Sequence, residues 1–163
     1  MIAPLHVIII ITRRKKQLQM IKNERGYVYN FSYHIVWVTK YRKPVFTTPK
    51  LVQDMKDAIN YLAGNHDVEI QSMEVMPDHV HLLVSFKPKL APADVVKILK
   101  GSSARLWFTA HPETKRKLWG GHLWSPSYYI GTLGDMSEQV VEEYINNQRT
   151  EKSNAGRPSK KGN

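Results

Sequence analysis

The stretch from Met76 to Ser85, MPDHVHLLVS, limits the possible fold more than any other part of the chain. Its polar and apolar residues alternate with a period of two, which predicts a β-strand with one face in a hydrophobic core. The core face consists of Val80, Leu82, Val84 and Phe86. His79 and His81 share the other face, where two imidazoles can bind one metal ion, although such a pair can also be a surface residue beside an internal hydrogen-bonding partner.

The charge balance of the chain favours a polyanionic partner. Its 163 residues include 24 Lys and Arg but only 14 Asp and Glu, for a formal net charge of +10. Nucleic acid fits this excess better than a membrane surface, because no long amphipathic basic helix is evident. The alternative is a protein that is merely basic. Because cysteine is absent, a metal would need nitrogen and oxygen ligands, and we expect a cytoplasmic location.

The two ends of the chain differ in composition from the middle. The apolar run Leu5 to Ile11 is far shorter than the roughly 20 residues that span a bilayer, and its basic residues follow it, unlike those of a signal peptide. We therefore expect residues 1–26 to be an extension poorly tied to the fold. Alternatively, translation starts later, for example at Met20, and the residues before it are not part of the protein. Residues 27–150 would form the domain and residues 151–163 a disordered basic tail, with no membrane segment.

The middle of the chain predicts alternating strands and helices. In order, these are a strand over 29–39, a helix from Thr48 to Gly64, a hairpin of strands over 68–76 and 79–86, a helix from Pro92 to about 106, a loop over 109–126, a strand over 127–133 and a helix over 137–148. This order predicts an α+β, ferredoxin-like split βαβ fold. Its antiparallel sheet would carry helices on one face, with an extra C-terminal helix.

Two basic segments are candidates for contact with DNA phosphates, although solvated surfaces could look the same. The candidate residues are Lys40, Arg42, Lys43, Lys97, Lys100 and Arg105. The first three flank Tyr41, which could stack on a base. The loop around Lys115–Lys117 has tryptophans nearby and also suits single-stranded nucleic acid, although some of these indoles must belong to the core. His34 could join the histidine pair, but a supporting or DNA-contacting role is favoured.

Five blocks of the sequence, in order, resemble the single-tyrosine transposases of the insertion sequence 200/605 type, within the His-hydrophobic-His nuclease superfamily. The blocks are YHIVWVTKYRKPVF (33–46), MPDHVHLL (76–83), LKGSSARLWF (99–108), LWSPSYYIGTLG (123–134) and VVEEYINNQ (140–148). The resemblance covers about residues 27–148. It departs from the family at Asp135, where glycine is common, and this affects only the expected flexibility of a hinge.

The resemblance implies a role for particular residues. His79, His81 and Gln148 would bind Mg²⁺ or Mn²⁺, and Tyr144, one helical turn before Gln148, would be the nucleophile. The tyrosine helix would carry the reaction on single-stranded DNA with hairpin ends, forming a 5′-phosphotyrosine link and a free 3′-OH without ATP. Members of the family act as homodimers, in some of which the tyrosine helix completes the partner's site.

Other functions remain open at this point. A non-catalytic module that binds single-stranded nucleic acid can use the same order of strands and helices, although the strands here lack the exposed aromatic pattern of RNA-recognition domains. A domesticated relative of the transposase is also possible. A relaxase is disfavoured, because relaxases usually have a third histidine ligand and a tyrosine at the other end of the chain.

Overall fold

The computed structural model of the chain describes residues 22–24, 27–29 and 31–132. The main elements are β1 (Lys22–Glu24), β2 (Tyr27–Tyr29), β3 (Ser32–Val38), α2 (Pro49–Gly64), β4 (Val68–Met76), β5 (His79–Phe86), α3 (Pro92–Val96), α4 (Ser102–Ala110), α5 (Pro112–Lys117) and β6 (Tyr129–Thr132). Three short turns of helix are η1 (Lys40–Arg42), η2 (Lys97–Gly101) and η3 (Trp119–Gly121).

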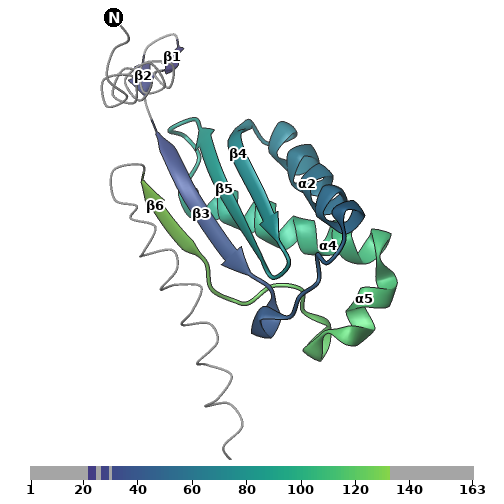
Figure 1. Ribbon diagram of the computed structural model, residues 1–163. Coiled ribbons are helices and arrows are strands. Elements are labelled where there is room, and N and C mark those ends of the chain that lie inside the picture. The colour runs from purple at the N-terminus through teal and green to yellow at the C-terminus, as the bar shows by residue number, and fades with distance from the viewer. Residues whose placement is uncertain (1–21, 25–26, 30, 133–163) are drawn as a thin grey trace, which may run out of the picture.

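A four-stranded antiparallel sheet forms the centre of the described chain, in the order β4-β5-β3-β6. Helices α2 and α4 lie together on one side of it (Figure 1). The α+β split βαβ fold predicted from the sequence is confirmed, with the histidine strand β5 inside the sheet. The predicted C-terminal helix lies outside the described residues.

The core lies between the sheet and the helices. Ile35 and Trp37 of β3 and Val80, Leu82 and Val84 of β5 are fully buried there, as the alternation along both strands predicts. Each of these strands therefore places every second residue in the core and leaves the intervening residues for the other face.

Helix α2 begins where the sequence predicts. The Thr48 hydroxyl accepts a hydrogen bond from the Leu51 amide at 3.3 Å, and Pro49 occupies the first turn, where its missing N–H costs nothing. Gly64 is the last helical residue, and Asn65 is the cap, one residue later than expected.

The second helix differs from the prediction in its buried stripe. The sequence suggested an inner face of Val95, Ile98, Leu99, Ser102 and Leu106, but the fully buried residues are Val95, Val96, Leu99, Ser103 and Trp107. The reason is η2, a π-helical turn between α3 and α4, which widens the helix and advances the buried positions to every fourth residue.

The predicted loop over 109–126 is partly wrong, because it contains α5 and η3. Pro112 suits the first turn of α5, Glu113 follows at the positive end of the helix, and Lys115–Lys117 occupy the negative end. These features outweighed the loop-like composition of the segment.

At the N-terminal end, β1 pairs with β2 to form a separate two-stranded sheet. The expected boundary between residues 26 and 27 lies between these two paired strands, and the division into an extension, a domain and a tail stays a prediction. Within the described part of the chain, no helix is long and apolar enough to cross a membrane.

Candidate metal centre on the open face of the sheet

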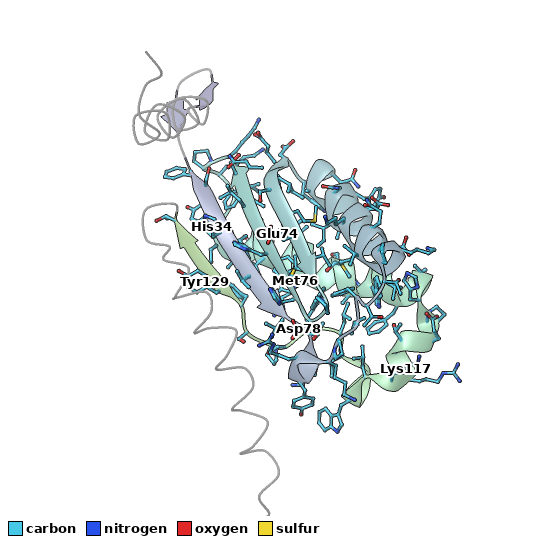
Figure 2. The ribbon with its side chains drawn as sticks, in the orientation of Figure 1. His34, Glu74, Met76, Asp78, Lys117 and Tyr129 are labelled. Atoms are coloured by element: carbon cyan, nitrogen blue, oxygen red, sulfur yellow. The ribbon has the colours of Figure 1, made fainter. Side chains whose placement is uncertain are left out.

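The open face of the sheet, defined here as the face turned away from α2 and α4, carries both predicted histidine ligands. Figure 2 labels Glu74 and Met76, the β4 residues directly opposite them. His79 lies between Met76 of β4 and Val38 of β3, and His81 lies between Glu74 and Val36. Directly opposite residues of neighbouring antiparallel strands share a face. The two imidazoles therefore lie on one surface, with a carboxylate beside the second.

His34 on β3 contacts the histidine pair directly. Its Nδ1 lies 3.0 Å from Nε2 of His81, so one ring donates a hydrogen bond to the other. Burial lowers the pKa of both rings, and the charge of the neighbouring His81 lowers the pKa of His34 further. For His81 the Glu74 carboxylate acts in the opposite direction, but burial is the larger effect. Both rings are therefore held towards the neutral form, which is the form that binds metal.

Asp78 orients the first histidine of the pair. Its Oδ1 accepts a hydrogen bond from His79 Nδ1 at 2.8 Å, and its Oδ2 binds the Arg42 guanidinium, with Nη2 at 2.7 Å and Nε at 2.9 Å. A proton on Nδ1 leaves the lone pair on Nε2 of His79 for a metal. The sequence analysis treated Asp78 only as a turn residue. The available signal was a carboxylate immediately before a His-x-His strand.

The donors on the open face suit a divalent cation that takes nitrogen and oxygen ligands. They are two imidazoles, one of them oriented by a carboxylate, with Glu74 nearby. His34 shares the Nε2 atom of His81, so binding of a cation at that atom requires the His34 ring to move. Among the described residues, no three His, Cys, Asp or Glu side chains form a group that could hold a metal. Tyr144 and Gln148 lie outside the described residues, and their roles stay predictions.

The basic residues of the first segment lie in and beside η1. Arg42 is only 9% exposed, and its guanidinium binds Asp78 rather than pointing into solvent. Lys40 extends over the Tyr41 ring, whereas Lys43 is exposed. DNA contact by these three residues stays a prediction, and for Arg42 the structure adds an internal contact that links η1 to the histidine strand.

The basic residues of the second segment line one pocket of about 450 Å³ between the η2–α4 helix and residues 121–128. Lys97 and Arg105 are exposed there. The Lys100 ammonium donates hydrogen bonds to the carbonyls of Pro126 and Ser127, both at 2.8 Å. Burial lowers the pKa of Lys100 to about 8. This pocket contains none of the open-face histidines. It shares Ser125 and Pro126 with a smaller pocket lined by Lys40 and Arg42, so the two basic segments lie on either side of residues 125–126.

The fold and the site together define a class: an α+β domain whose sheet carries a His-hydrophobic-His pair, with a carboxylate that orients the first histidine. Residues 27–148 match the family model described as "Transposase IS200 like". The chain belongs to this family of DNA transposases.

Individual relatives are consistent with this. The ISDra2 transposase TnpA of Deinococcus radiodurans is 46% identical over 127 residues, which cover 78% of this chain and 90% of that protein. The transposase for insertion sequence element IS200 of Salmonella typhimurium is 28% identical over 123 residues, or 76% of this chain and 80% of that protein. A crystal structure of a Deinococcus radiodurans protein described as a transposase superposes with a TM-score of 0.73. Its sequence is 42% identical, and the match covers 78% of this chain and 97% of that one.

Proposed function

We propose that this transposase cleaves and rejoins single-stranded DNA at the ends of an insertion sequence, using Tyr144 as nucleophile beside a divalent cation. The observation that carries the proposal is the pair His79 and His81 on the open face, where Asp78 orients His79 and burial lowers the pKa of His81. His79 and His81 would hold Mg²⁺ or Mn²⁺ together with Gln148.

The residues of this chain would act as follows. The Tyr144 oxygen attacks the scissile phosphorus, a bond forms between them, and the bond from phosphorus to the 3′ oxygen breaks. The leaving oxygen takes up a proton to become a 3′-OH, and the phenol loses one. Because a phenol has a pKa near 10, the attack needs help at neutral pH. A divalent cation held by His79, His81 and Gln148 would supply that help by withdrawing charge from the phosphate.

Cleavage exchanges one phosphodiester bond for another, so the free energy of the broken DNA bond is conserved in the 5′-phosphotyrosine bond. A 3′-OH of another DNA end can therefore attack it and restore a phosphodiester without ATP, which makes the cleaving enzyme also a strand transferase. The DNA would carry hairpins near the element ends, and the protein would act as a homodimer in the cytoplasm. Light scattering tests whether the protein is a dimer, because a dimer has twice the molecular mass of the 18.8 kDa chain.

The decisive experiment detects the covalent intermediate. The full chain is incubated with labelled single-stranded hairpin DNA from the ends of its own element, in Mg²⁺ or Mn²⁺, and resolved on a denaturing gel. We expect a labelled protein–DNA adduct that is lost in Tyr144→Phe and in the presence of a chelator. Tyr61→Phe is the matched control, because Tyr61 on α2 is 64% exposed and lies on the helical side of the sheet.

An adduct that persists in Tyr144→Phe would assign the nucleophile to another residue. Hairpin binding with no adduct under any of these conditions would instead favour the non-catalytic binding module or a domesticated relative.

A further inference from the structure

An aromatic pair lies on the surface outside the metal centre. Trp119 of η3 is 65% exposed, whereas the other three tryptophans, Trp37, Trp107 and Trp124, are at most 8% exposed. The Trp119 ring meets Tyr41 of η1 edge to face, with centroids 5.7 Å apart and planes at 74°. The two rings come from segments nearly 80 residues apart in the sequence. An exposed indole in contact with a second ring forms a continuous aromatic surface, which can serve as a binding surface.

A lysine ammonium lies against this pair. The Lys40 ammonium lies 4.9 Å from the Tyr41 centroid and 6.0 Å from the Trp119 centroid. Exposed Lys43 follows η1, and the basic end of α5, Lys115–Lys117, precedes η3 (Lys117 points outward in Figure 2). The nearby carboxylate of Asp78 is already paired with Arg42. Aromatic faces among cations are the composition that binds single-stranded nucleic acid, through stacking and phosphate contacts.

The backbone of η1, which carries Tyr41, is held in a conformation that costs free energy. Tyr41 and Arg42 have φ of 55° and 50°, which are left-handed values that non-glycine residues rarely adopt. Each such residue costs on the order of 1–3 kcal/mol, and this strain is typical of functional sites. On the other side of the pair, Gly120 and Gly121 take φ of 63° and 66° without that cost.

Backbone hydrogen bonds to the turn between β4 and β5 and to the segment before β6 hold η1 in this strained form. The Lys40 amide donates to the Leu123 carbonyl at 2.8 Å, and the Thr39 amide donates to the Asp78 carbonyl at 2.9 Å. The Asp78 carboxylate then joins Arg42 of η1 to His79 of the metal centre. Asp78 therefore contacts both η1, which carries Tyr41, and the first histidine of the metal centre.

We propose that Tyr41, Trp119 and Lys40 form a stacking site for one unpaired base of single-stranded DNA, with Lys40 neutralising the adjoining phosphate. This rests on the proposed function for the identity of the strand, but the binding itself requires no cation and no Tyr144. A protein partner that packs a side chain against the rings fits less well, because the Lys40 ammonium and the net charge of +10 favour a polyanion.

Binding of fluorescein-labelled oligothymidylate of about 12 nucleotides to the full chain tests the site, by anisotropy in EDTA. Loss of one stacking contact weakens binding about fivefold or more, which is the result expected for Trp119→Ala. Tyr41→Gly should have a similar effect while relieving the backbone strain. Trp119→Phe should retain most of the affinity, and Tyr61→Ala, which removes an equally exposed ring on α2, should not change it.

Intrinsic fluorescence gives a second readout. Because the other three indoles are buried, unlabelled oligothymidylate should quench mainly Trp119, and the quenching should disappear in Trp119→Phe although binding remains. Equal binding by wild type, Trp119→Ala and Tyr41→Gly would overturn the proposal. The proposal would also be overturned if Trp119→Ala and Tyr41→Gly lost as much affinity for a duplex of the same length as for the single strand. Retention of the quenching in Trp119→Phe would overturn it as well.

The two proposals can fail separately. A wild-type adduct together with unchanged binding in Trp119→Ala would remove the stacking site and keep the transposase chemistry. Weakened binding in Trp119→Ala without any adduct from the wild type would keep the stacking site and remove the chemistry.

Discussion

The two faces of the four-stranded sheet use alternate residues of the same strands for different purposes. On the core face, β5 contributes Val80, Leu82 and Val84, all fully buried against the helices. On the open face, the same strand contributes His79 and His81, which bind Asp78 and His34. The difference teaches that apolar burial fixes where the strand lies, while the intervening positions are free to carry chemistry that does little for stability.

The largest expected effect is on the core face. Leu82→Ala removes a fully buried side chain and leaves a cavity, so we expect the free energy of unfolding to fall by about 2–5 kcal/mol, measured by urea denaturation. The open-face substitution His81→Ala should lower the free energy of unfolding by only about 1 kcal/mol, because it removes one hydrogen bond. It should nevertheless weaken Mn²⁺ binding severely. Equal destabilisation by both substitutions would contradict the claim that the core face stabilises the fold while the open face contributes little to stability.

The next effect is expected at the metal centre. Asp78→Asn keeps an oxygen near His79 Nδ1 but removes the charge that pairs with Arg42. We expect Mn²⁺ affinity to fall about 10- to 100-fold, as for other residues that orient a metal-binding histidine. Titration calorimetry measures this, with Asp94→Asn on α3 as the matched control. A folded Asp78→Asn protein with wild-type affinity would show that the carboxylate does not orient the ligand.

One position on the open face is as tightly packed as the core. A Cβ at Gly131, opposite His34, would lie 2.6 Å from the Tyr129 hydroxyl oxygen. Gly131→Ala should therefore displace Tyr129 and cost about 1 kcal/mol in thermal or urea unfolding, since the tyrosine can rotate. Gly64→Ala, where nothing lies within 4 Å of the new carbon, should cost nothing and can stabilise α2. Equal stability of the two variants would contradict the close packing.

Most of the fold was predictable because local patterns agreed with the tertiary structure. The alternation of β5 and the Thr48–Pro49 start of α2 each predicted the observed element. The buried stripe of the second helix was not predictable, since the π-helical turn η2 adds a residue that no periodicity in the sequence announces. The helix α5 was missed because its signal is carried by end charges rather than by an apolar stripe.

The candidate site was predictable only in part. The pair His79 and His81 follows from spacing along one strand, but the contact between His34 and His81 depends on the register of β3 against β5. The Asp78–Arg42 pair likewise joins residues 36 positions apart in the sequence. The exposure of Trp119 among three buried tryptophans depends on tertiary packing, which composition does not reveal.

The smallest expected effect lies away from both faces of the sheet, at Lys100. Burial lowers its pKa to about 8 in the folded chain, against about 10.5 in the unfolded chain. Between these values the unfolded chain binds more protons, so the contribution of Lys100 to stability rises with pH from about 8 to about 10.5. Lys100→Met should lack this rise, and the difference in unfolding temperature between wild type and variant should change across that window.

Lys100→Arg is the control, since arginine stays charged throughout this range and should also lack the rise. A wild type whose pH dependence matches that of both variants would mean that the Lys100 ammonium titrates as if in water. In that case its two carbonyl contacts would offset the cost of burial, and Lys100 would remain a full positive charge for DNA at every pH at which the enzyme works.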